Sequence, residues 1–202
     1  MSKIFENDRH VSLGRRLFFS DVGKATLSAS AVALIAGCDS MAARQTTQMP
    51  SDPMQDVAIL NVALGLEHQA IGAYQLGAES GLLQPAVLTT AVLFQTHHKE
   101  HRDGLESTIR KLGGTPVESK TLQAYAQELD AAAIKNQTDI LMLAHRLEKE
   151  AADAYLGVIP SFQDGALSEM GGRVACDEAM HWTVLQQALG MPLPAHSLSF
   201  GA

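Results

Sequence analysis

Carboxylate and imidazole side chains that could bind metal ions occur in two matching sets along the chain. The last member of the first set lies 34 positions after its first member, and in the second set this separation is 33 positions. The members are Glu67, His98 and His101 in the first set and Glu148, Glu178 and His181 in the second. Iron, manganese and zinc accept such oxygen and nitrogen donors. The pattern therefore indicates metal chemistry.

The sequence around each set is also repeated. Residues 66–74 (Leu-Glu-His-Gln-Ala-Ile-Gly-Ala-Tyr) align with residues 147–155 (Leu-Glu-Lys-Glu-Ala-Ala-Asp-Ala-Tyr), with five of nine positions identical. The His98-x-x-His101 motif corresponds to Glu178-x-x-His181, and each motif has a leucine four residues later. A duplicated helical hairpin explains this repeat most economically.

Four long helices are needed to position these side chains. Apolar residues recur at spacings of three and four, which is typical of helices in a bundle. The predicted helices begin near Pro53, Pro85, Thr138 and Ala166 and end near Ser80, Gly113, Ile159 and Leu189. About twenty residues separate the second and third helices, a length that suits a crossover connection. The prediction is an all-α four-helix bundle over residues 53–192, followed by a tail over 193–202.

The six candidate ligands fall on stripes that otherwise carry apolar side chains. An unpaired buried carboxylate costs several kcal/mol, so these residues need partners. Side chains three apart on a helix share a face, which allows Glu178 and His181 to bind one centre. A bundle whose polar core residues only hydrogen-bond one another is the alternative.

The motif Glu-x-x-Ala-x-x-x-Tyr on two helices, with Glu-x-x-His on a third, resembles the ferritin and rubrerythrin superfamily over nearly all of residues 55–190. In that superfamily a lone Glu from each of two helices and a Glu-x-x-His from each of the other two hold two metal ions. The resemblance implies a ferritin-like bundle with two iron or manganese ions. Its implied ligands are Glu67, Glu148, Glu178, His181 and His101.

His98 departs from this pattern, because the family has Glu at its position. Three histidines and three carboxylates would compensate the charge of two divalent ions less well. Glu100, alone or with His97, could substitute if the second helix were rotated by one position. Phe94 and Leu105 lie in register with His98 and His101 and favour these two histidines.

Tyr74 and Tyr155 lie two turns beyond Glu67 and Glu148. Their hydroxyls could hydrogen-bond a ligand from the opposite half and orient it, although core tyrosines satisfied by any buried acceptor are the alternative. Of the remaining candidates, His68 and His97 are expected to face solvent. His145 is expected at the surface or beside Glu148, and Cys176 and Met180 in the core.

The N-terminal segment predicts export. Arg15 and Arg16, followed by Phe18 and a weakly apolar stretch, resemble a twin-arginine signal over residues 1–37. The Ile-Ala-Gly-Cys sequence ending at Cys38 resembles a lipobox, so Cys38 would become the acylated N-terminus ahead of a flexible tether over 38–52. Asp39 favours the inner membrane, and the predicted location is the periplasm on a lipid anchor. An ordinary cleaved signal with a chance cysteine is the alternative.

Composition limits the possible functions. The net charge is −7 and residues 1–37 are net basic, so the rest is more acidic still and no nucleic acid is expected as a partner. The resemblance implies redox chemistry on peroxide, dioxygen or ferrous iron, as a possible di-metal oxidoreductase. A non-catalytic scaffold or stress-related binding module is the alternative, and a lipid tether fits poorly with a closed iron-storage shell. With only two cysteines and no Cys-x-x-Cys motif, electrons would come from a separate donor. A homodimer is possible.

Overall fold

The computed structural model describes residues 53–201, and these residues form an α-helical bundle. The four long helices are α3 (Pro53–Glu79), α4 (Pro85–Lys111), α6 (Gln137–Val158) and α7 (Gly165–Ala188). Between α4 and α6 lie the short helix α5 (Leu122–Glu128) and the 3-10 turn η2 (Ala131–Ala133), and a second 3-10 turn, η3 (Ile159–Ser161), joins α6 to α7. The predicted all-α fold is confirmed.

Local sequence signals set the ends of these helices. Asn136 and Asp139 form a capping box at the start of α6, in which each side chain accepts a hydrogen bond from the other residue's backbone N–H. The Asp164 side chain caps α7 by accepting from the Ala166 N–H. Gly113 and Gly190 follow α4 and α7 with φ of 81° and 68°, a conformation that favours glycine.

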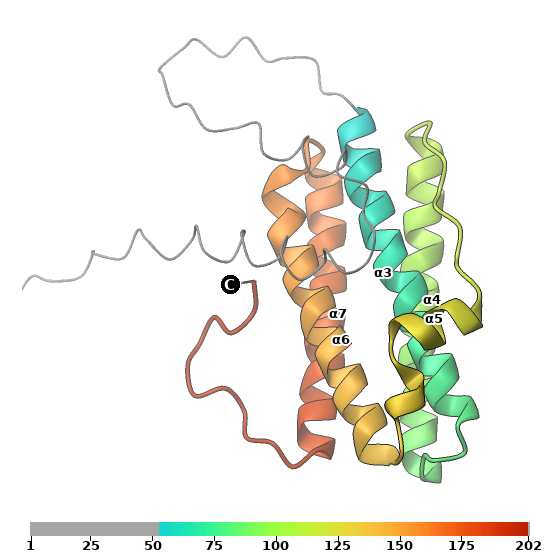
Figure 1. Ribbon diagram of the computed structural model, residues 1–202. Coiled ribbons are helices and arrows are strands. Elements are labelled where there is room, and N and C mark those ends of the chain that lie inside the picture. The colour runs from blue at the N-terminus through green and yellow to red at the C-terminus, as the bar shows by residue number, and fades with distance from the viewer. Residues whose placement is uncertain (1–52, 202) are drawn as a thin grey trace, which may run out of the picture.

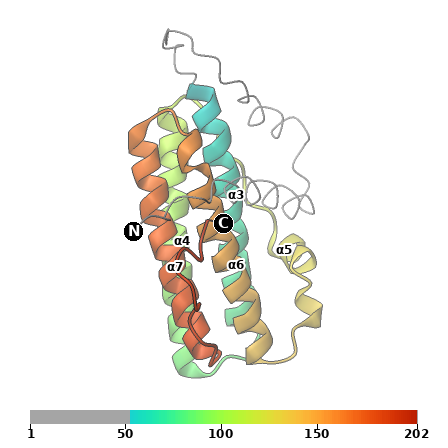
Figure 2. The same cartoon turned by 90° about the vertical axis from the view of Figure 1, so that its left-hand side faces the viewer.

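The helices form two antiparallel hairpins joined by a crossover (Figures 1 and 2). Helix α3 packs along α4, and α6 packs along α7. The connection after α4 runs back along the bundle, so α6 begins at the same end as α4. Gly72 permits this path, because a Cβ there would lie 2.6 Å from the Tyr125 ring of α5. The predicted crossover is confirmed.

The core has two apolar layers with a polar band between them. One layer contains Leu60, Leu64, Leu105 and Ile109, all at most 1% exposed, near the start of α3. The other layer contains Tyr74, Phe94, Leu141 and Leu185, near the end of α3. The candidate metal ligands lie in the band between these layers.

Some side chains next to the apolar stripes are not in the core. Cys176 is exposed and Met180 is 47% exposed, so the prediction of core positions for both was wrong. Each lies beside a buried position of α7, and the rotation of one residue along a helix turns it outward.

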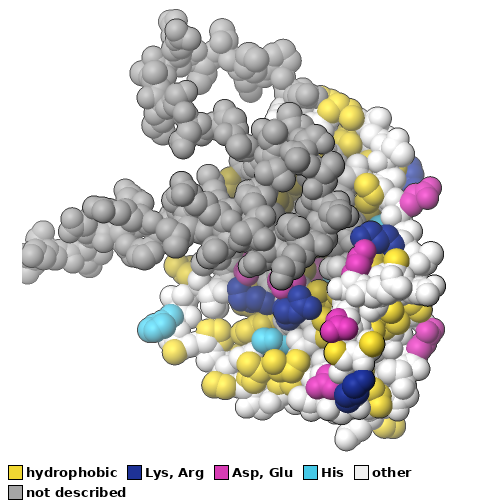
Figure 3. All heavy atoms as spheres, in the orientation of Figure 1, with side chains coloured by type: hydrophobic (Ala, Val, Ile, Leu, Met, Phe, Trp, Pro, Cys, Tyr) yellow, Lys and Arg dark blue, Asp and Glu magenta, His cyan; other side chains and the backbone are white. Residues whose placement is uncertain are grey.

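On the visible face, acidic and basic side chains are interspersed (Figure 3).

The C-terminal residues return to the bundle. Phe200 packs edge-on against Trp182 of α7 with ring centroids 5.1 Å apart, and the Gly201 N–H donates to Asp153 of α6. Among residues 53–201, no helix is both long and apolar enough to cross a membrane. The predicted export signal at Arg15 and Arg16 and the lipidation site at Cys38 lie outside the described residues.

Candidate metal centre

The structure brings the six predicted ligands together in the middle of the bundle. Each long helix contributes at least one of them. They are Glu67 from α3, His98 and His101 from α4, Glu148 from α6, and Glu178 and His181 from α7. Five of these side chains are at most 1% exposed and His101 is 10% exposed, so the cluster is almost fully shielded from water.

The cluster divides into two groups that could each hold a metal ion. We call Glu67, His98, His101 and Glu178 group one, and His98, Glu148, Glu178 and His181 group two. Within each group the possible ligand atoms all lie within 4.8 Å of one another. His98 and Glu178 belong to both groups, so two ions bound here would be neighbours that share ligand residues.

His98 lies between the two groups, with one ring nitrogen toward each lone carboxylate. Its Nδ1 lies 2.8 Å from Glu67 Oε2, and its Nε2 lies 3.2 Å from Glu148 Oε1. Glu100 is exposed on the same helix. The alternative of a rotated second helix with Glu100 as ligand is therefore wrong, and His98 occupies the interior position.

Glu178 and His101 present polar atoms to the cluster that make no hydrogen bond among the described residues. These atoms are Glu178 Oε1, Glu178 Oε2 and His101 Nδ1. Glu178 Oε1 lies 3.3 Å from His101 Nδ1, and Glu178 Oε2 lies 3.4 Å from His181 Nδ1, both without hydrogen-bond geometry. Buried polar atoms are rarely left without partners, because this costs stability. Carboxylate oxygens and an imidazole nitrogen that converge without hydrogen-bond partners are suited to bind a metal cation.

Two further residues orient the histidines from outside the cluster. The Nδ1 atoms of His101 and His181 face the cluster, and their Nε2 atoms face outward. His101 Nε2 lies 3.2 Å from Asp177 Oδ2. His181 Nε2 lies 2.9 Å from His97 Nδ1. Such outer hydrogen bonds fix the ring and the tautomer of a metal-binding histidine. The expectation that His97 faces solvent was wrong, because its ring is half-buried and stacks on His181.

The repeat contained a signal for these outer residues. His97 immediately precedes His98, and Asp177 immediately precedes Glu178, so both occupy the same position in their halves. Each contacts a histidine of the opposite half. The sequence analysis considered His97 only as a substitute ligand and did not identify Asp177.

The two tyrosines connect the halves of the cluster reciprocally. Tyr155 donates a hydrogen bond of 2.5 Å to Glu67 Oε1, and Tyr74 donates one to Glu148 Oε1. Both tyrosines are buried. Each hydroxyl therefore holds a carboxylate of the opposite half in place, as the sequence had suggested it could.

The neighbouring charges shift the protonation of the cluster strongly. Burial alone would raise the pKa of Glu67, but His101 and His98 outweigh this effect and lower it to about 2. Burial alone would lower the pKa of His101, but Glu178 and Glu67 raise it to about 10. Burial raises the pKa of Glu178 despite His101 and His181. The metal-free cluster thus compensates its carboxylates with protonated imidazoles.

We expect metal binding to release protons. A histidine must be neutral to bind a metal, and the pKa of His101, raised to about 10, keeps this ring protonated at pH 7. Glu148 and Glu178 raise the pKa of His181 as well. The apparent affinity should therefore rise with pH, by about tenfold per pH unit for each proton displaced. Calorimetric titrations with Mn²⁺ in buffers of different ionisation enthalpy would measure this release. His196 is exposed and is not one of the six candidate ligands, so the His196→Ala control should release as many protons as the wild type. Metal binding without proton release would contradict the expectation.

Two other histidines have structural partners. His68 is buried and its Nε2 lies 3.2 Å from the Val117 carbonyl oxygen, so the expectation that it faces solvent was wrong. His145 is half-buried, hydrogen-bonds Gln186 and packs on Trp182. Neither belongs to the two groups.

A four-helix bundle with a crossover and a central carboxylate–histidine cluster defines the ferritin-like class of proteins. The sequence matches the ferritin-like domain family over residues 55–191, and the chain belongs to this family. The fold is similar to the crystal structure of a conserved hypothetical protein from Mycobacterium tuberculosis. The TM-score is 0.58 at 23% identity, and the similarity covers 72% of this chain and 99% of that one. Comparison with curated proteins gave no match.

Proposed function

We propose that this protein binds two iron or manganese ions and uses them for redox chemistry on peroxide, dioxygen or ferrous iron. The observation that carries the proposal is the buried cluster, in which Glu178 and His98 belong to two overlapping ligand groups. The unsatisfied atoms of Glu178 and His101 support it further, because a cluster selected only for hydrogen bonding would satisfy them.

The residues of the two groups would hold two adjacent ions, which would supply two-electron redox chemistry toward peroxide or dioxygen. The protein's own residues would supply the setting for this chemistry. Glu67, Glu148 and Glu178 would provide three negative charges, while the bonds of Tyr74 and Tyr155 would keep the two lone carboxylates from turning away. The surrounding apolar layers would limit the access of water.

The proposal also includes location. Export by the twin-arginine route, with a lipid anchor at Cys38, would place the bundle in the periplasm at a membrane surface. Twin-arginine systems export folded proteins, which would allow the metal to be loaded beforehand. A separate electron donor would complete a catalytic cycle.

Elemental analysis of the protein, exported and purified without chelator, tests the metal proposal. We expect close to two equivalents of iron or manganese in the wild type and almost none in a Glu148→Ala, Glu178→Ala double variant. A Glu106→Ala, Glu169→Ala double variant should keep its metal, since Glu106 and Glu169 form only outer ion pairs within helices. Addition of hydrogen peroxide or Fe²⁺ to the loaded protein would then identify the substrate.

Equal, near-zero metal in the wild type and the double variant would refute this proposal. The alternative of a non-catalytic lipoprotein that serves as a scaffold or stress-related binding module would then be favoured.

A further inference from the structure

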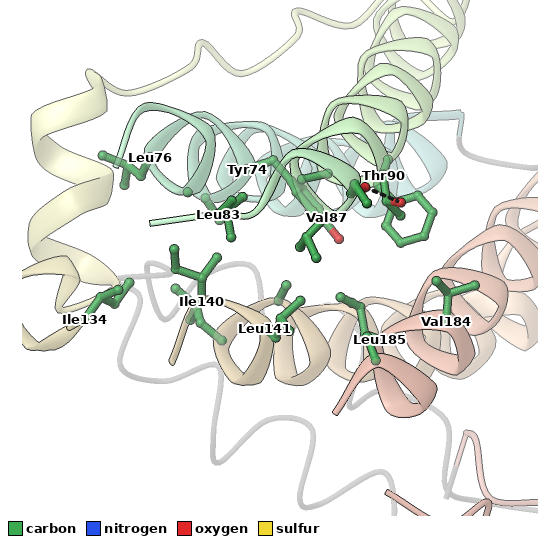
Figure 4. Close-up of a pocket in the computed structure, with 18 of the residues that line it drawn as sticks. Tyr74, Leu76, Leu83, Val87, Thr90, Ile134, Ile140, Leu141, Val184 and Leu185 are labelled. Atoms are coloured by element: carbon green, nitrogen blue, oxygen red, sulfur yellow. Dashed lines mark hydrogen bonds between the residues drawn. The ribbon is translucent and has the colours of Figure 1, made fainter. Parts of the chain in front are cut away.

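A cavity of about 220 Å³ lies between the two hairpins, outside both ligand groups. It is located toward the end of α3 and the start of α4, about one helical turn or more beyond the ligands. Figure 4 shows Leu83 and Val87 on one side facing Leu141 and Leu185 on the other. The cavity is thus walled by all four long helices.

The walls offer an apolar surface with almost no free hydrogen-bonding groups. Among the described residues that line the cavity, only Tyr74 and Thr90 have polar side chains. The Tyr74 hydroxyl donates to Glu148, and the Thr90 hydroxyl donates to the Ala86 carbonyl oxygen. A water molecule needs two to four polar partners to be stable in a cavity, so these walls favour an apolar occupant.

The cavity is one side chain away from the metal ligands at two points. Tyr74 lines the cavity and hydrogen-bonds Glu148. Phe94 also lines it and stacks on His181, with ring centroids 4.1 Å apart. A molecule in the cavity would therefore contact side chains that contact group two directly.

We propose that this cavity binds a small apolar organic molecule, of the size of a substituted benzene or a short alkyl chain. A cavity of roughly 150 Å³ with similar walls takes up benzene, whereas drug-sized ligands need about 300 Å³ or more. The volume here lies between these values. The cavity is partly open to solvent, so a ligand has a route into it.

Binding of this kind is independent of the proposed metal chemistry, because the cavity walls contain no member of either group. It adds a site for an organic ligand beside a centre whose proposed substrates are oxidants or metal ions. The ring of Tyr74 and the ring of Phe94 would report its occupancy.

Benzene is the probe for the test, added to the full-length protein. We expect the melting temperature to rise by roughly 3 to 5 °C at ten times the dissociation constant, because only the folded state has the cavity. The ring resonances of Tyr74 and Phe94 should shift in the same titration. Val87→Phe, which fills the cavity, should lose both responses, and Ala144→Leu provides a second filling variant if Val87→Phe does not fold.

Val92→Phe is the matched control, because Val92 lies on the same helix, is 48% exposed and does not line the cavity. It should respond to benzene as the wild type does. The proposal is overturned if benzene leaves the wild type unchanged, or if the filling variants respond equally. Metal content, measured on the same samples, should be equal in all variants and separates this result from the metal proposal.

Discussion

Glu178→Gln is expected to abolish tight binding of both metal ions. Glu178 is the only carboxylate among the described residues that belongs to both ligand groups, and its two oxygens face His101 and His181 on opposite sides. Loss of an outer hydrogen bond alone weakens a metal site by about 10–100-fold. Loss of a shared charged ligand should therefore weaken each site by at least about 100-fold. Anaerobic titration with Fe²⁺ or Mn²⁺ would measure both affinities.

The single-group carboxylates provide the comparison. Glu67→Gln should weaken mainly the ion of group one, and Glu148→Gln mainly that of group two, since each belongs to one group. Glu169→Gln, on the exposed face of the same helix as Glu178, should bind two ions with wild-type affinity. A Glu178→Gln protein that still binds two ions tightly would show that the shared carboxylate is not a ligand.

His98→Glu is expected to strengthen binding of the second ion by tenfold or more while it destabilises the metal-free protein. Three carboxylates leave two divalent ions with an excess positive charge, and a fourth carboxylate would neutralise it. Without metal, the variant has four buried carboxylates and lacks the imidazole that pairs with Glu67 and Glu148. Removal of one partner from a buried ion pair costs about 3–5 kcal/mol.

Metal titration and chemical denaturation, each with and without chelator, would test both halves of this expectation. His98→Gln is the control, because it removes the imidazole without adding charge, so it should lower stability and not strengthen the second site. Equal second-ion affinity in the wild type and His98→Glu would mean that charge compensation does not limit this centre.

The bundle could be predicted from sequence because its determinants are local. The spacing of apolar residues predicts each long helix, and prolines, glycines and capping residues predict where it begins and ends. Helix α6, for example, was expected from Thr138 to Ile159 and runs from Gln137 to Val158. The ferritin-like family assignment, made from the Glu-x-x-Ala-x-x-x-Tyr and Glu-x-x-His motifs, is confirmed as well. That the six clustered residues bind metal stays a prediction.

The features that could not be predicted depend on how helices rotate against one another. The repeat marks His97 and Asp177 as equivalent positions, but whether His97 contacts solvent or His181 is decided by the facing helix. Cysteine is a residue type that is often buried, yet Cys176 points outward from α7 beside the buried Ala175. The cavity is formed by side chains of all four helices, so no single segment could reveal it.

The crossing bonds of the two tyrosines have a consequence for the origin and assembly of this fold. Each hairpin supplies half of the ligands and one hydroxyl that supports the other hairpin, while the chain from Leu112 to Asn136 supplies none of them. Two copies of one ancestral hairpin, associated around a two-fold axis, would produce this same interlocking arrangement. The ligand set itself therefore needs no residue of the connection, whose part is to pack Tyr125 and Leu129 against Ala73 of α3.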